Sequence, residues 1–354
     1  MTRSISARSR MPVFVVGSPR SGTTLVYDML MSAGGFAIYL GESSIFNVVA
    51  PRFGDLGLRK NRQKMWHAWL GSKLFRASGI DPQRVETKIL DNCRNAGDFL
   101  CTIMEEIARN QNAQRWAGNT PEEILYLPLI KRTIPDALVI HVIRDGRDVA
   151  LSLSRRRYIR PFPWKKRETT LGAAIYWEWI VKKGRNFGRM LGPDYKEICF
   201  ERLVSDPRSV LSDLSSFLDQ ELVYDRIQRT ALGSVSKPNT SFQAESTEEF
   251  NPVERWRQQF SPGEIAEIER LVGETLAELG YTLATDGAAQ YSKIVRARKK
   301  LAYHLFFNAK LWAKKSAVLR ALRPDFTSQQ IDGVVIADEK GPEKVRHLTP
   351  FRRQ

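Results

Sequence analysis

The stretch Gly17-Ser18-Pro19-Arg20-Ser21-Gly22-Thr23-Thr24 decides the fold of this chain. It follows the short β-rich run Val13–Val16 and leads into Thr23–Ala33, where apolar residues recur at helical spacing. This order predicts a strand, a tight turn and a helix. Gly17 and Gly22 have the spacing of a P-loop, in which backbone amides and a helix N-terminus hold a phosphate.

The cation of this loop is in an unusual place. P-loops that cleave ATP carry a lysine just before the final hydroxyl residue, where it reaches the β- and γ-phosphates. Here that position is Thr23, and Arg20 lies inside the loop instead. The sequence therefore predicts phosphate binding without the chemistry of an ordinary kinase. A glycine turn capped by Ser or Thr is the simpler interpretation of the same stretch.

A second turn of this kind follows the apolar, β-branched run Leu138–Ile143 and begins Arg144-Asp145-Gly146-Arg147-Asp148. Arg144 ends the expected strand, and Ser152 lies in the expected helix that follows. These two residues are placed to converge on a second phosphate, because arginine supplies both charge and a fork of donors. The alternative is a solvated turn of ion pairs, which would contribute little to stability.

The rest of the body alternates in the same way. A helix is expected over Asp148–Arg157, a weaker strand over Tyr195–Phe200 and another helix over Pro207–Leu218. Apolar strands that alternate with helices predict an α/β fold, here a P-loop-like, mostly parallel sheet flanked by helices on both faces.

Composition limits the class of protein. The chain has 354 residues, of which 42% are hydrophobic and 27% charged, and these values exclude a largely disordered chain. Three cysteines are too few and too scattered for a disulfide framework or a four-ligand zinc site. No run reaches the length of a membrane span or a signal-peptide core, so we expect a cytoplasmic protein.

The formal net charge of +16 predicts an anionic partner. Its distribution divides the chain into a basic tail (residues 1–10), a P-loop domain (11–284) and a basic C-terminal extension (285–354). On a helical wheel, apolar residues of the extension share one face: Ile294, Leu301, Leu305, Trp312 and Leu319. We favour a helix that packs this face on the body; peripheral membrane contact through residues 293–323 is the alternative.

Together the two motifs resemble those of sulfotransferases that use 3′-phosphoadenosine 5′-phosphosulfate. Pro19–Thr24 (PRSGTT) is similar to the 5′-phosphosulfate loop of that family, and Arg144–Ser152 (RDGRDVALS) to its 3′-phosphate motif. Their order and their separation of some 120 residues also match. Further likeness lies in three later segments: Phe200–Leu218, Ser234–Asn239 (SVSKPN) and Glu254–Trp256 (ERW).

The resemblance implies an enzyme that moves a sulfuryl group from this nucleotide to a hydroxyl or amine. It assigns the 5′-phosphate and the sulfuryl group to Arg20, Ser21, Gly22, Thr23 and Thr24. It assigns the 3′-phosphate to Arg144, Ser152 and Arg156, and further nucleotide contacts to Ser234 and Lys237. Among catalytic groups, Arg20 would neutralise charge on the transferring group.

The resemblance also suggests the base that removes the acceptor's proton. Glu42, in Gly41-Glu42-Ser43, stands where protein-tyrosine sulfotransferases and several glycan sulfotransferases have their glutamate base. His67, in an aromatic stretch, is the best substitute among the four histidines. His141 alternates with apolar residues on a strand, so we expect it in the core.

The chain departs from the family pattern at two positions. Related sequences often have a lysine where this chain has Asn119, and the missing charge would fall to Arg20 or Lys88, or activity would be lower. Phe200 replaces the usual tyrosine, which removes a hydroxyl and keeps the aromatic ring.

The sequence says less about the molecules that the protein binds besides the nucleotide. The acceptor is a glycan, lipid, peptide or small molecule, no metal is expected, and a homo-oligomer is left open. The alternative hypothesis is a basic membrane- or nucleic-acid-binding protein with an impaired nucleotide fold. Nucleic acid is the weaker partner, because the aromatic residues do not form the stacking platform of an RNA or single-strand binder.

Overall fold

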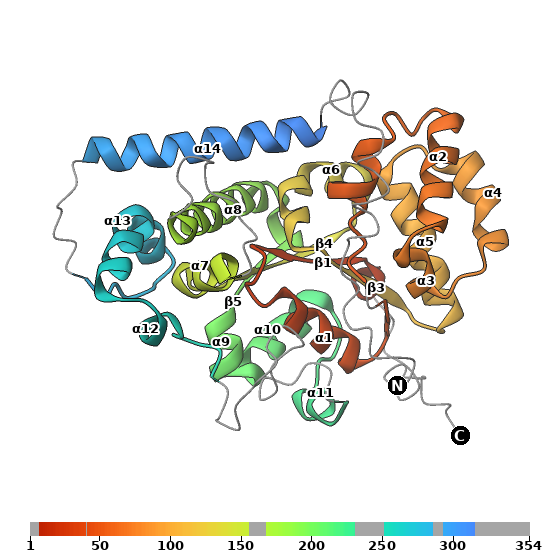
Figure 1. Ribbon diagram of the computed structural model, residues 1–354. Coiled ribbons are helices and arrows are strands. Elements are labelled where there is room, and N and C mark those ends of the chain that lie inside the picture. The colour runs from red at the N-terminus through yellow and green to blue at the C-terminus, as the bar shows by residue number, and fades with distance from the viewer. Residues whose placement is uncertain (1–6, 40, 156–167, 231–250, 286–292, 316–354) are drawn as a thin grey trace.

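The computed structural model describes residues 7–39, 41–155, 168–230, 251–285 and 293–315. Its centre is a five-stranded sheet in the order β2-β3-β1-β4-β5, and every neighbouring pair is parallel (Figure 1). The strands are β1 (Val13–Gly17), β2 (Phe36–Ala37), β3 (Arg115–Asn119), β4 (Leu138–Ile143) and β5 (Tyr195–Cys199). The predicted parallel α/β fold is confirmed.

Three of these strands were predicted, and two were not. β1, β4 and β5 agree with the predicted runs to within one residue. β2 has only two residues, and β3 (Arg-Trp-Ala-Gly-Asn) has neither an apolar run nor a clean alternation. β3 exists because it pairs with β1, with Val13 opposite Ala117 and Val15 opposite Asn119. Its strand conformation therefore depends on tertiary pairing rather than on local preference.

The two faces of the sheet are covered by different helices (Figure 1). Val13 and Val15 of β1 point to one face, and Phe14 and Val16 to the other, as the alternation of a strand requires. The first face is covered by α1 (Thr23–Ala33), α9 (Phe200–Ser205), α10 (Pro207–Leu218) and α11 (Tyr224–Thr230). The second is covered by α5 (Ala96–Asn110), α6 (Leu127–Thr133), α7 (Gly146–Arg155), α8 (Thr169–Leu191) and α13 (Pro262–Glu278).

A group of helices extends the second face to one side. α2 (Arg59–Leu70), α3 (Lys73–Ser78) and α4 (Pro82–Asn92) pack with α5 around the stacked rings of Trp66 and Trp69. Short elements complete the body: η1 (Ala7–Arg10), the π-helix η2 (Ile45–Val49), η3 (Ala50–Arg52), η4 (Pro121–Tyr126), η5 (Gly192–Asp194) and α12 (Trp256–Gln259).

The basic extension forms α14 (Lys293–Lys315), which lies along α8 on the outside of the molecule (Figure 1). A helix was predicted here, but the face expected to pack was wrong. Tyr303 and Phe307 are the buried aromatic residues of α14, whereas Leu301 and Leu305 are 59% and 60% exposed. The Phe307 ring packs against the rings of Tyr176 and Trp179 on α8. Aromatic contacts, rather than the aliphatic stripe, therefore hold α14 on the body. Leu319 lies outside the described residues.

None of the helices in the described ranges is long and apolar enough to cross a membrane.

Candidate active site

The carboxyl ends of three neighbouring strands bring the sequence motifs together. β1 ends at Gly17, where the first loop begins, and β4 ends at Ile143, immediately before Arg144. On the other side of β1, β3 ends at Asn119. In open parallel sheets, ligands bind in the crevice outside the carboxyl ends of the strands. The two motifs predicted to hold phosphates therefore lie side by side.

The loop after β1 depends on its two glycines. Gly22 has φ of 93°, a left-handed conformation that side chains other than glycine rarely adopt. A Cβ atom there would lie 2.3 Å from the Phe200 ring, and one at Gly17 would lie 2.5 Å from the carbonyl oxygen of Val142. Arg20 also has a positive φ, of 74°, which turns the loop sharply between the glycines. The backbone is therefore held in a fixed, tightly packed turn.

This turn has unused hydrogen-bond donors. Helix α1 begins at Thr23, and its N-cap residue, Gly22, has no side chain to bond the first amides of the helix. The hydroxyl of Ser21 is buried and has no hydrogen-bond partner. An orphaned buried hydroxyl and uncapped amides at a helix N-terminus fit an anionic oxygen of phosphate size. The residues present therefore fit the phosphate group of a nucleotide.

The first loop and the second motif are in direct contact. Arg20 Nε donates to Ser152 Oγ at 3.0 Å, and Arg144 Nη1 donates to the carbonyl oxygen of Arg20 at 3.1 Å. Arg144 is 4% exposed, donates from Nη2 to the carbonyl of Pro252 and lies over the Phe200 ring at 4.5 Å. Arg144 thus holds the loop backbone, while its buried Nε has no partner.

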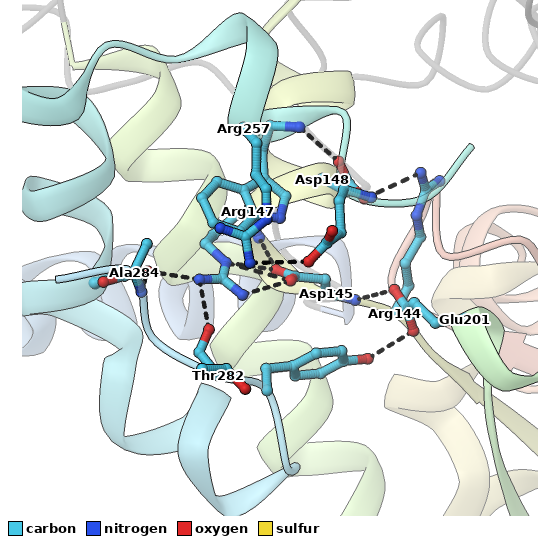
Figure 2. Close-up of polar contacts among 12 residues, drawn as sticks. Arg144, Asp145, Arg147, Asp148, Glu201, Arg257, Thr282 and Ala284 are labelled. Atoms are coloured by element: carbon cyan, nitrogen blue, oxygen red, sulfur yellow. Dashed lines mark hydrogen bonds and ion pairs between the residues drawn. The ribbon is translucent and has the colours of Figure 1, made fainter. Parts of the chain in front are cut away.

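The charged residues of the second turn are buried. They bond one another and neighbouring segments (Figure 2). Arg147 is 2% exposed, and its guanidinium bonds Asp145 at 2.7 Å and Glu269 at 2.5 Å. It also lies 3.8 Å from the centre of the Trp256 ring. The interpretation of this motif as a solvated turn of weak ion pairs was therefore wrong.

Asp148 fastens a distant segment to the same turn. Its carboxylate accepts the backbone amides of Glu254 and Trp256, each at 3.0 Å, and lies 3.7 Å from Arg144. Burial raises the pKa of Asp148 to about 6, against the charge of Arg144, which lowers it. The segment with the ERW sequence is thereby held beside the loop. Arg156, Ser234 and Lys237 lie outside the described residues.

Glu42 lies half-buried in the segment between β2 and η2. Burial, and secondarily the charge of Glu122, raises the pKa of Glu42 to about 7. A carboxyl group with this pKa exists in both protonation states near neutral pH, which suits a general base.

The backbone next to Glu42 is anchored to the segment that follows β3. Glu123 accepts hydrogen bonds from Ser43 Oγ at 3.5 Å and from the Phe46 amide at 3.4 Å. The Ser44 amide donates to Thr120 Oγ1 at 3.3 Å. Because β3 pairs with β1, these contacts tie the position of Glu42 to the strand that leads into the phosphate loop.

The family is settled by comparison with known proteins. The Sulfotransferase family matches residues 12–225, which include both motifs and Glu42. The chain belongs to the sulfotransferase family.

Individual relatives of this sulfotransferase-family chain are distant. An uncharacterized protein of Aquifex aeolicus is 23% identical over 303 residues, which cover 78% of this chain and 36% of that protein. Protein-tyrosine sulfotransferase A of Caenorhabditis elegans is 27% identical over 211 residues, which cover 58% of this chain and 49% of that protein. The chain thus spans about a third to a half of these relatives.

The fold has solved counterparts. The sulfotransferase domain of the Synechococcus PCC 7002 olefin synthase has a TM-score of 0.51 and 18% sequence identity, and the match covers 75% of this chain and 94% of that domain. At this identity the likeness is one of fold.

The structure shows what surrounds Asn119, one of the two departures from the family pattern. Asn119 is 8% exposed, and its buried Oδ1 has no partner. Lys88 lies on α4 and pairs with Glu105 on α5 at 3.2 Å. Of the two cations considered as replacements for the missing lysine, Arg20 is the one within the loop.

The structure places two of the histidines considered in the sequence, His67 on α2 and His141 on β4. His67 is on an exposed face of α2, where its Nδ1 lies 2.7 Å from the carbonyl oxygen of Gln63. α2 packs on α3 and α4, so the structure does not bring His67 to the motifs. His141 is buried in β4 against the Tyr195 hydroxyl, and burial lowers its pKa to about 3. Its predicted core position is confirmed.

Sequence reasoning missed several residues that position this site. Glu201 accepts the amide of Asp145 at 2.9 Å, and Trp177 Nε1 donates to the carbonyl of Arg144 at 3.0 Å. Glu123 was missed as the anchor of the Glu42 segment. The signal for Glu201 was present in the Phe200–Leu218 likeness, whereas Trp177 and Glu123 act through tertiary contacts that no local pattern encodes. In the described ranges, no group of three or more His, Cys, Asp or Glu residues could hold a metal ion.

Proposed function

We propose that this protein transfers a sulfuryl group from 3′-phosphoadenosine 5′-phosphosulfate to a hydroxyl or amine of an acceptor. One observation carries the proposal: the loop after β1 and the motif after β4 are joined by the Arg20–Ser152 hydrogen bond. Two anion-binding elements in contact fit a nucleotide that has phosphates at both ends of its ribose. A P-loop protein specific for ATP needs only the first of them.

The first loop would bind the 5′ end of the donor. The Ser21 hydroxyl and the amides at Gly22, Thr23 and Thr24 are donors for the 5′-phosphate, and the Thr hydroxyls add to them. Arg20 brings the one positive charge of this loop. Because donors and charge are fixed before binding, they cost little reorganisation during the reaction.

The second motif would bind the 3′-phosphate. Ser152 is half-buried next to Arg20, so its hydroxyl is placed for this phosphate. Arg144 contributes charge from beneath the loop and fixes the backbone of Arg20. Arg156, Ser234 and Lys237 remain proposed nucleotide contacts.

Glu42 is the proposed base. The donor supplies the sulfuryl group as a mixed anhydride of phosphate and sulfate. The Glu42 carboxylate accepts the proton of the acceptor hydroxyl, whose oxygen then forms a bond to sulfur as the bond between sulfur and the 5′-phosphate oxygen breaks. Arg20 and the loop amides stabilise the charge that develops on the departing phosphate.

The acceptor class is a separate question. One relative is protein-tyrosine sulfotransferase A of Caenorhabditis elegans, and another is a putative protein-tyrosine sulfotransferase of Caenorhabditis briggsae. Their likeness supports an acceptor with a hydroxyl group. A screen of phenols, tyrosyl peptides, glycans and lipid alcohols with donor labelled in its sulfate identifies the acceptor.

Two measurements test the proposal. Calorimetry should show tight binding of adenosine 3′,5′-bisphosphate and weak binding of both AMP and ATP. The Glu42→Gln variant should keep this affinity and lose transfer of label to any acceptor that the parent uses. Equal affinities for AMP and the bisphosphate would remove the role of the second motif, and normal turnover of the variant would exclude Glu42 as the base.

A further inference from the structure

We propose that the outward face of α14 is a docking surface for an anionic lipid membrane. The observation behind this proposal is a concentration of exposed apolar side chains. In the described part of the chain, seven large hydrophobic residues are exposed, and five of them lie on α14. They are Ile294 (76%), Val295 (50%), Leu301 (59%), Leu305 (60%) and Trp312 (67%).

Four of these residues form one stripe. Ile294, Leu301, Leu305 and Trp312 are separated by seven, four and seven positions, a spacing that returns to the same side of a helix. Tyr303 is buried on the opposite side, against α8. At about 1.5 Å of rise per residue, the stripe is about 27 Å long. It can lie in the plane of a membrane interface along its whole length.

Ion pairs on the inner side fix this orientation. Lys300 bonds Glu178 of α8 at 2.8 Å, and Lys299 bonds Glu168 at 3.1 Å. The Glu178 side chain is fully buried and also accepts a hydrogen bond from Thr275 of α13. The acidic partners of α14 therefore lie beneath the helix, and the helix cannot roll to bury its stripe without breaking these pairs.

The charge of α14 points to the occupant. α14 has eight Lys and Arg residues and no Asp or Glu. Arg298 is exposed and lies within the spacing of the stripe itself, and Lys182 of the neighbouring α8 has a side chain that is 42% exposed. An apolar stripe with an exposed arginine and an exposed tryptophan, on a basic helix without acids, matches the acyl boundary and the phosphates of an anionic bilayer.

A second copy of the chain fits this surface less well. Two such helices packed stripe to stripe would pair two strongly basic helices without an acid on either of them. They would also bury Arg298 without a partner carboxylate, which is costly. On a membrane the same arginine meets lipid phosphate.

Sedimentation of the 354-residue chain with lipid vesicles tests the proposal. We expect binding to vesicles of phosphatidylcholine mixed with phosphatidylserine, weak binding to phosphatidylcholine alone, and a loss of binding in high salt. The double substitution Leu301→Ser, Leu305→Ser should weaken binding about tenfold or more, because two exposed apolar anchors are lost. Met190→Ser is the matched control, since Met190 is 69% exposed on α8 and lies outside the stripe.

Spectroscopy gives a second readout. Brominated lipids in the anionic vesicles should quench the fluorescence of the parent protein, and Trp312→Phe should remove that quenching. Equal vesicle binding by the parent and the double variant would overturn the proposal. So would a dimer, detected by light scattering without lipid, that the double substitution dissociates, because a second copy would then be the occupant. Nucleotide binding by the double variant should equal that of the parent, so this test is independent of the proposed catalysis.

Discussion

Arg20 Nε donates a hydrogen bond to Ser152 Oγ at 3.0 Å and so connects the loop after β1 with helix α7, across 132 positions of sequence. Arg144 adds a second connection, because its guanidinium donates to the carbonyl oxygen of Arg20. The two motifs therefore form one structural unit.

Ser152→Ala is the first prediction. Loss of the hydroxyl should lower the affinity for adenosine 3′,5′-bisphosphate about 10- to 100-fold, since hydrogen bonds to charged groups contribute about 1.5–3 kcal/mol. Binding of AMP, which lacks the 3′-phosphate, should change much less. Calorimetry with both nucleotides measures the difference. Ser154→Ala is the control, because that hydroxyl bonds only the carbonyl of Leu151 in its own helix. A loss of equal size for both nucleotides would contradict the assignment of Ser152.

Glu42 sets the second prediction, a dependence on pH. A base acts as a carboxylate, and burial together with the Glu122 charge raises the pKa of Glu42 to about 7. Activity should therefore be low in acid and rise as the pH passes through about 7. The measurement is the pH profile of kcat/KM, which reports groups of the free enzyme.

A neighbouring charge checks this assignment. Glu122→Gln removes a negative charge that opposes ionisation of Glu42, so the acid limb should move to lower pH while burial keeps it above the ordinary glutamate range. Glu105→Gln, on α5 and paired with Lys88, should leave the profile in place. If the limb does not move in Glu122→Gln, a group other than Glu42 controls the reaction.

Arg147 gives a prediction for stability. Arg147→Met should destabilise the fold by about 3–5 kcal/mol, because it leaves the buried carboxylates of Asp145 and Glu269 without their partner. Denaturant unfolding measures this change. Arg208→Met also breaks a two-point arginine–aspartate pair, with Asp225, but that pair is exposed and its loss should hardly alter the unfolding curve. Similar curves for the two variants would mean that the buried network does not stabilise the turn.

The sequence predicted those parts of the fold whose signal is local. β1, α1, β4 and α10 have apolar runs or helical spacing that end at clear turns, and their bounds agree with the structure to within one residue. β3 has no such run and forms because β1 offers it a partner. The packed face of α14 was missed for a related reason. A helical wheel shows only where apolar residues gather on the helix. In the structure, Tyr303 and Phe307 pack on the body, with Phe307 against an aromatic ring of α8, and the longer aliphatic stripe stays exposed.

The same division applies to the candidate site. The motifs predicted that Arg20, Arg144 and Ser152 come together, because β1 and β4 are parallel neighbours whose carboxyl ends lie side by side. They did not show that Arg147 and Asp148 would be buried. That outcome requires Glu269 and Trp256, more than 100 positions away in sequence. Local pattern identifies the groups proposed to contact a ligand, and tertiary contacts determine which neighbouring residues hold the site together.

The last prediction concerns the cation that replaces the missing lysine. Asn119 has no charge, and Lys88 is paired with Glu105. We therefore propose that Arg20 neutralises the transferring group. Arg20→Met should lower kcat about 10²–10³-fold, as the loss of a group that stabilises charge in the transition state does. Lys88→Met should keep normal turnover. Single-turnover transfer of label from the sulfate donor measures both variants, with calorimetric affinity for the bisphosphate as a check on binding. If Lys88→Met lowers transfer as much as Arg20→Met, Arg20 is not the cation that replaces the missing lysine.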